Sequence, residues 1–130
     1  MKRSTFLTIT ALIYIPSGIA MILMPHTIFG LLGFDLGVDG AILGKVTGAA
    51  ILGMGLMNFY SRNSSFTPSL KGIIIGNMVY HILDVIFIAT AVYGELLNEV
   101  SRGMIVFHGV LAFGFAYYIL KKPAPLSAGT

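Results

Sequence analysis

The chain has 130 residues, of which 56% are hydrophobic and only 10% are charged, and its formal net charge is +3. Because soluble domains carry about 25% charged residues, this composition excludes an ordinary water-soluble domain and indicates a protein of the lipid bilayer. The sequence contains no cysteine, which excludes disulfides, thiol catalysis and thiolate metal sites.

Four long apolar runs follow one another along the chain, at residues 4–24, 40–61, 70–93 and 103–120. Each run approaches or exceeds the roughly 20 residues that an α-helix needs to cross a hydrocarbon core. Because the connections are short, consecutive helices should be antiparallel. The sequence therefore predicts an all-α fold, an integral membrane four-helix up-down-up-down bundle, with residues 1–130 forming a single transmembrane domain.

The first run has two features of a secretory signal. It starts with basic residues, and its segment PSGIA places Gly18 and Ala20 where a signal peptidase cuts. The apolar sequence nevertheless continues to Met24. We therefore expect a retained helix kinked at Pro16, with cleavage as the less favoured alternative.

The link PHTIFGLLGFDLGVD between the first and second runs is itself rather apolar. Phe29, Leu31, Leu32 and Phe34 are expected to lie in a short helix or a re-entrant turn at the outer membrane interface. Such a segment would serve as an interfacial anchor or, as the less favoured alternative, as a lid over a site below it.

Glycine recurs every four residues in two of the runs. Gly40, Gly44 and Gly48 form a strip on one face of the second run, and Gly72 with Gly76 forms a shorter pair in the third. Small residues at this spacing let helix backbones approach closely in lipid. We expect these strips to pack helices within the bundle, and the alternative is contact between copies in an oligomer.

The charged residues at the segment ends predict the orientation. One set of ends carries basic residues only, namely Lys2, Arg3, Arg62, Lys71, Lys121 and Lys122. The opposite connections carry Asp35, Asp39, Glu95 and Glu99 with Arg102 as their one basic residue. The positive-inside rule then places both termini in the cytoplasm of a multi-pass protein of the cell membrane. No basic stripe is interleaved with exposed aromatic residues, so nucleic acid is not an expected partner.

The third run contains polar residues where a membrane helix should be apolar. In the stretch GNMVYHILDVIF, Asn77, His81 and Asp84 fall within about 60° of one another on one helix face, and Tyr80 borders that face. A central Asp or Lys costs about 2.5–3.5 kcal/mol on membrane-insertion scales. The polar face therefore indicates a specific role.

Other helices carry polar residues at comparable depth. Counted at 1.5 Å per residue from the outer helix ends, Lys45 and His108 lie about 8–9 Å deep, Asp84 about 13 Å deep and His81 near the midplane. Tyr14, Ser17 and Thr47 fall in the same layer. We predict a charge pair between Lys45 and Asp84, in a pocket open to the outer side. The predicted lining of this pocket is His81, His108, Asn77 and Tyr80.

Several alternatives to this pocket remain open. The polar set could serve only as hydrogen-bonding contacts between helices, and Lys45 could extend its side chain to the outer surface. A metal site is disfavoured because Lys45 would repel a cation. Haem ligation by His81 and His108 is disfavoured because their estimated depths differ by about 9 Å. No metal site is therefore predicted, and the sequence leaves the cofactors unknown.

The pocket predicts binding of a lipid-like or quinone-like small molecule, in a protein that acts as an accessory subunit of a membrane complex. The alternative is an oligomeric proton-linked transporter or channel that uses Asp84 and His81. Acid–base catalysis by the same two residues is conceivable. The sequence shows no nucleophile motif or phosphate-binding loop, so whether the protein is an enzyme stays open.

Three segments, SGIAMILMP, FGLLGF and GKVTGAAILGMGLMNFYSR, resemble the DoxX-like group of small four-helix membrane proteins of bacteria and archaea. The resemblance covers roughly the first half of the chain. Second spans in that group often begin with a basic residue near the position of Lys45. The group includes partners of membrane redox systems, so the resemblance implies a prokaryotic protein in a quinone or lipid environment.

Overall fold

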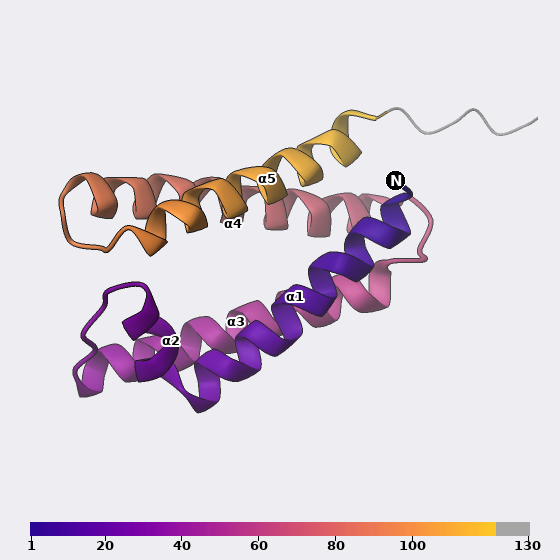
Figure 1. Ribbon diagram of the computed structural model, residues 1–130. Coiled ribbons are helices and arrows are strands. Elements are labelled where there is room, and N and C mark those ends of the chain that lie inside the picture. The colour runs from indigo at the N-terminus through magenta and orange to yellow at the C-terminus, as the bar shows by residue number, and fades with distance from the viewer. Residues whose placement is uncertain (122–130) are drawn as a thin grey trace, which may run out of the picture.

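The computed structural model of the protein describes residues 1–121 and consists of helices joined by short connections (Figure 1). The helices are α1 (Arg3–Leu23), α2 (Pro25–Leu31), α3 (Val38–Ser61), α4 (Pro68–Tyr93) and α5 (Val100–Leu120). All but α2 are long and apolar enough to cross a membrane. The predicted all-α, up-down-up-down bundle is therefore confirmed, with α2 as an additional short helix in the apolar link.

The four long helices form two antiparallel pairs. α1 packs along α3, and α4 packs along α5, whereas α3 and α4 touch each other little (Figure 1). We call the contact between the two pairs the seam. α1 continues through Pro16, as expected for a helix in which neighbouring groups satisfy the carbonyl that proline frees.

Glycine brings the backbones of α1 and α3 into direct contact. A Cβ atom added to Gly18 would lie 2.6 Å from the Gly48 carbonyl oxygen, and one added to Gly48 would lie 2.8 Å from that of Gly18. At Gly55 an added Cβ would lie 3.0 Å from the backbone nitrogen of Ile15. No other residue fits at these distances, so the first helix pair depends on glycine in both helices.

The other predicted packing glycines have different surroundings. Gly44 faces Phe29 and Pro25 of α2, with the nearest ring carbon 2.9 Å from an added Cβ. Gly40 faces only Leu36 of the preceding connection. Gly72 and Gly76 have no heavy atom within 4 Å of an added Cβ. Their strip lies on an open face of α4 and does not pack the two helix pairs together.

The short helix α2 connects the first helix pair to the start of α5. The side-chain amide of Asn98 donates a hydrogen bond of 3.1 Å to the Leu31 carbonyl, and the Ser101 hydroxyl donates one of 2.9 Å to the Leu32 carbonyl. Gly33 has a φ of +93°, and an added Cβ would lie 3.0 Å from the backbone nitrogen of Asn98. These contacts hold the two pairs together at one end of the molecule.

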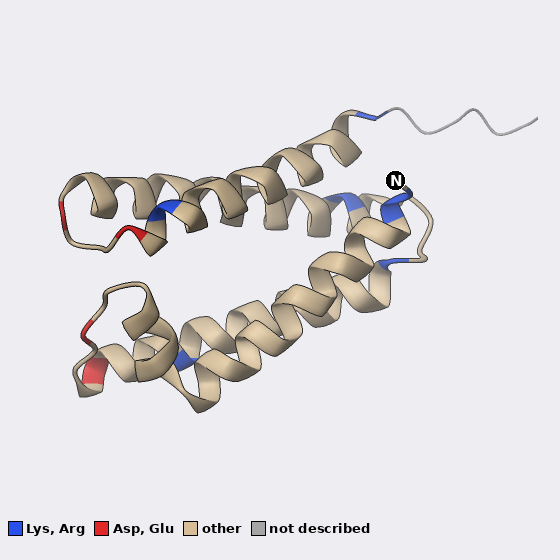
Figure 2. Cartoon of the chain, in the orientation of Figure 1, with Lys and Arg blue, Asp and Glu red and all other residues tan. Residues whose placement is uncertain are grey.

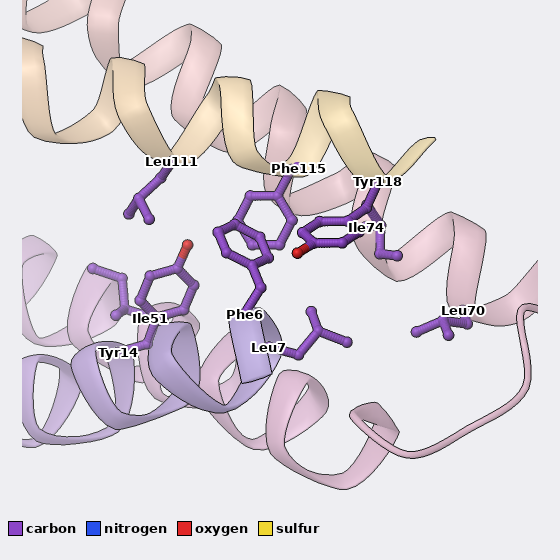
Figure 3. Close-up of a cluster of buried hydrophobic side chains, with 9 residues drawn as sticks. All are labelled: Phe6, Leu7, Tyr14, Ile51, Leu70, Ile74, Leu111, Phe115 and Tyr118. Atoms are coloured by element: carbon purple, nitrogen blue, oxygen red, sulfur yellow. The ribbon is translucent and has the colours of Figure 1, made fainter. Parts of the chain in front are cut away.

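Apolar side chains fill the seam toward the other end (Figure 3). Phe6 of α1 lies edge-on to Phe115 of α5, with ring centroids 4.8 Å apart, and beside Tyr118 at 5.2 Å. Gly114 makes room for this contact, because an added Cβ there would lie 2.6 Å from the Phe6 ring. The Tyr118 hydroxyl also donates a hydrogen bond of 3.0 Å to the Met1 carbonyl.

Charge is separated between the two ends of the bundle (Figure 2). The end that holds the N-terminus and the end of α5 carries Lys2, Arg3, Arg62, Lys71 and Lys121. The other end carries all the acidic residues of the connections, with Lys45 and Arg102 as its basic residues. We call them the basic end and the acidic end. Lys122, predicted to lie beside Lys121, falls outside the described residues.

Candidate functional site

Four polar side chains lie in continuous contact across the seam, through two hydrogen bonds and one ion pair. The Tyr14 hydroxyl of α1 is hydrogen-bonded to Nε2 of His81 on α4. Nδ1 of His81 lies 2.9 Å from Nδ1 of His108 on α5, and that same His108 nitrogen lies 3.1 Å from Oδ2 of Asp84 on α4. We call this set the Tyr14–Asp84 chain. It joins both helix pairs through groups able to carry protons.

The Tyr14–Asp84 chain runs from a closed interior to a partly open end. The exposed fractions are 4% for Tyr14, 1% for His81 and 6% for His108. The Asp84 side chain, in contrast, is 25% exposed. A molecule that approaches from outside the bundle can therefore reach Asp84 first.

Aromatic rings surround the two histidines. The His81 imidazole stacks on the Phe115 ring at 5.8 Å and 18° between planes. Tyr80 lies edge-on to His81 at 5.2 Å and tilted toward His108 at 6.2 Å. Packing on several sides fixes the orientation of both imidazoles, so the hydrogen-bonding atoms are held in place before any ligand arrives.

The contacts determine where the protons lie when Asp84 is ionised. A carboxylate only accepts hydrogen bonds, and a neutral imidazole has one N–H and one lone pair. An ionised Asp84, whose Oδ2 lies 3.1 Å from Nδ1 of His108, favours the tautomer that carries the hydrogen on this nitrogen, where it is donated to the lone pair on Nδ1 of His81. His81 consequently carries its own hydrogen on Nε2 and donates to Tyr14.

Asn77 belongs to a different polar cluster, closer to the basic end of the seam. Its side-chain amide exchanges hydrogen bonds of 3.1 and 3.2 Å with that of Asn58 on α3. Asn58 also donates to the Thr10 hydroxyl of α1 at 3.2 Å, and Asn77 donates to the Ile73 carbonyl at 2.8 Å. We call Thr10, Asn58 and Asn77 the Asn cluster. Its members are at most 2% exposed, and they satisfy one another, as in a contact that fastens helices.

The predicted charge pair between Lys45 and Asp84 is not formed. Lys45 is exposed on α3, and the ion-pair partner of Asp84 is His108. The physical reason is that a lysine near a helix end can extend its long side chain to the aqueous interface. The aspartate side chain is too short to extend in this way, so its carboxylate needs a partner at its own depth.

The predicted difference in depth between His81 and His108 is also wrong, because their Nδ1 atoms are in hydrogen-bonding contact. α5 begins at Val100, earlier than predicted, which places His108 about 4–5 Å deeper. α5 also crosses α4 at an angle (Figure 1). Depths counted along straight, parallel helices therefore do not apply to this pair.

The site contains residues that the sequence did not single out. Tyr14 was placed only in the same layer, and Thr10 and Asn58 were not assigned to any site. A signal was present in α1, where Leu7, Thr10, Tyr14 and Gly18 recur at helical spacing and are all buried. Two polar residues on the buried face of a membrane helix require partners on other helices.

An apolar groove lies between α4 and α5. It has a volume of about 310 Å³ and is lined by Ile82, Val85, Ile86, Gly109, Ala112, Phe113 and Ala116. Val85 directly follows Asp84, and Gly109 directly follows His108. However, successive residues of a helix point about 100° apart, so Asp84 lies on the opposite side of α4 from the groove residues Ile82 and Ile86. The groove and the polar pair are therefore on different faces of the α4–α5 pair.

Within residues 1–121, no three His, Asp or Glu side chains converge in an arrangement suited to a metal ion. Comparison with family models finds no match for the chain, and neither curated proteins nor solved structures match it. The function of the candidate site must therefore be inferred from its geometry.

Proposed function

We propose that this small membrane protein binds a lipid-like or quinone-like molecule whose polar group contacts Asp84 and His108. The observation that carries the proposal is the Tyr14–Asp84 chain, two buried hydrogen bonds followed by an ion pair to a partly exposed carboxylate. Polar groups able to contact a ligand are thus presented from a rigid, largely dry interior.

The comparison with the Asn cluster supports a role beyond fastening helices. That cluster already joins α1, α3 and α4 with uncharged side chains. Holding the helices together does not require an aspartate, which costs about 2.5–3.5 kcal/mol at the centre of a membrane helix. A ligand site explains why an energetically costly residue, Asp84, is present and why its side chain is partly exposed.

The apolar groove of the α4–α5 pair suits a hydrocarbon chain. Its volume of about 310 Å³ lies at the lower end of the range of about 300–1,000 Å³ that small-molecule sites span. Its lining carries no polar side chain. Because Asp84 lies on the opposite side of α4, this groove suits an acyl chain of the surrounding bilayer, and the polar group of the proposed ligand is held by Asp84 and His108 alone.

The biological setting is part of the same proposal. A DoxX-like protein of a prokaryotic cell membrane, acting as an accessory subunit of a redox complex, would have quinones and lipids beside this site. The separation of charge in Figure 2 supports an orientation with the basic end, and both termini, in the cytoplasm. Because the chain has no cysteine, a single cysteine placed at Ser65 tests this: an impermeant thiol reagent added outside should fail to label it.

An oligomeric proton-linked transporter or channel is the second candidate, and one observation favours it. His81 is contacted through both ring nitrogens, by His108 on one side and by Tyr14 on the other. An imidazole held in this way can accept a proton on one nitrogen and release one from the other.

Native mass spectrometry of the protein released from mild detergent tests the first candidate. We expect a monomer or dimer with a discrete bound mass, which Asp84→Asn removes while the helical content stays unchanged. Asp35→Asn, in the exposed connection after α2, serves as the matched control and should keep the bound mass.

Two outcomes contradict the proposal. A larger oligomer without bound mass, together with pH-dependent flux in liposomes that Asp84→Asn abolishes, would establish the transporter instead. Unfolding of Asp84→Asn, with no bound mass on the wild-type protein, would reduce the Tyr14–Asp84 chain to a structural contact.

A further inference from the structure

His108 uses only one of its two ring nitrogens within the protein. Both its contact with Asp84 and its contact with His81 are made by Nδ1. Nε2 has no hydrogen-bond partner among residues 1–121, and it is not among the fully enclosed side-chain atoms that lack a partner. Within residues 1–121 this nitrogen therefore has no partner, and a ligand that contacts Asp84 can provide one.

The carboxylate decides what Nε2 can do. With Asp84 ionised, the hydrogen of the neutral His108 ring is on Nδ1, so Nε2 presents a lone pair and accepts hydrogen bonds. Asp84 itself is acceptor-only. The Tyr80 hydroxyl lies close to Asp84, so its hydrogen has an acceptor within the protein. The open polar atoms of the site are then acceptors.

Within residues 1–121, no lysine or arginine forms an ion pair with Asp84. Lys45, the basic residue predicted for the site, is exposed on α3 and forms no ion pair with Asp84. Arg102, nearer along α5, is paired with Glu99 at 2.9 Å. A ligand must supply the hydrogen itself.

We infer that the site selects a ligand that carries a hydroxyl group, a quinol or a lipid alcohol, over the corresponding quinone or ketone. The inference rests on the proposed function and specifies its ligand class. A hydroxyl donates to Nε2 of His108 or to Asp84. A carbonyl oxygen would face the same two acceptors with lone pairs only.

The size of the preference follows from the open groups. A site built to hydrogen-bond a hydroxyl discriminates strongly against an analogue that cannot donate, because polar groups of the site are left unpaired. Asp84 is partly exposed and water can satisfy it in part. We therefore expect a preference of about tenfold or more, which one hydrogen bond to a charged group provides.

The first test measures which ring nitrogen of His108 carries the hydrogen. The chain contains three histidines, so nitrogen NMR of protein labelled with ¹⁵N-histidine in lipid nanodiscs can resolve each ring. We expect His108 to be neutral with its hydrogen on Nδ1, and in Asp84→Asn we expect this preference to be lost. A His108 with its hydrogen on Nε2 in the wild-type protein would overturn the inference.

The second test compares ligands that share one tail. Ubiquinol and ubiquinone with a ten-carbon side chain are titrated anaerobically into the same nanodiscs. We expect the quinol to bind about tenfold or more tightly and to shift the Nε2 resonance of His108. Asp84→Asn should bring the two affinities together, because an amide can donate to Nδ1 and leave Nε2 with a hydrogen. Asp35→Asn should keep the wild-type ratio.

The outcomes separate this inference from the proposed function. Equal affinities, or a preference for the quinone, leave ligand binding in place and overturn the selection of a hydroxyl group. Failure of both forms to bind the wild-type protein contradicts quinone-like binding itself. In that case a long-chain alcohol and its matching ketone repeat the comparison, and failure of this pair overturns both.

Discussion

The interior of the first helix pair and the seam between the two pairs are packed in different ways. α1 and α3 meet backbone to backbone through Gly18, Gly48 and Gly55, whereas across the seam the helices are joined through side chains such as Phe6 and Phe115. The two kinds of packing serve two different purposes. Close backbone contact makes a rigid unit, and a seam of side chains has room for hydrogen-bonded polar groups. The Tyr14–Asp84 chain and the Asn cluster both lie there.

The largest loss of stability is expected when one methyl group is added at Gly48, inside the first helix pair. In Gly48→Ala the new Cβ would lie 2.8 Å from the Gly18 carbonyl oxygen, so the helices must separate. We expect a loss of about 2–3 kcal/mol in the free energy of unfolding, measured by denaturant titration in detergent micelles.

The same substitution on the open face of α4 is the matched control. Gly76→Ala meets no atom within 4 Å, and alanine favours the helix by up to about 1 kcal/mol. We expect no loss of stability. If Gly76→Ala destabilises the protein as much as Gly48→Ala does, this face of α4 is also packed, for example in an oligomer, and the comparison of the two regions fails.

A smaller effect is expected from the Asn cluster. Asn58→Leu leaves Asn77 and the Thr10 hydroxyl without their partner, and hydrogen bonds between membrane helices contribute about 0.6–2 kcal/mol. We expect a loss of about 1 kcal/mol in the same titration. The two asparagines hydrogen-bond each other. The double variant Asn58→Leu/Asn77→Leu should therefore lose less stability than the sum of the losses of the two single variants. Strict additivity would show that the cluster does not act as a unit.

The smallest effect is expected at Lys45. Its side chain is exposed, so Lys45→Gln should change the free energy of unfolding by less than about 0.5 kcal/mol and leave ligand retention unchanged. Loss of the bound mass in Lys45→Gln, as in Asp84→Asn, would instead restore the charge pair predicted from the sequence.

The polar residues show how far sequence reasoning reaches. The stripe of His81 and Asp84 could be found because helical periodicity places residues on one face without knowledge of any partner. The separation of Asn77 from this set could not be found. Asn77 and His81 lie one turn apart on the same face of α4, and only the position of Asn58 on α3 decides which group Asn77 joins. The contact of His81 with His108 depends likewise on how far α5 is shifted and tilted against α4.

The sequence by itself determined that this is an all-helical membrane protein with alternating helix directions, because hydropathy, length and charge at the segment ends act locally along the chain. Only the tertiary structure decided that the helices form two pairs, that Gly48 packs while Gly76 does not, and that Asp84 is paired with His108 rather than Lys45. These contacts join residues far apart in the chain, and in lipid they are selected by the fit of backbones and hydrogen bonds, which no single helix encodes.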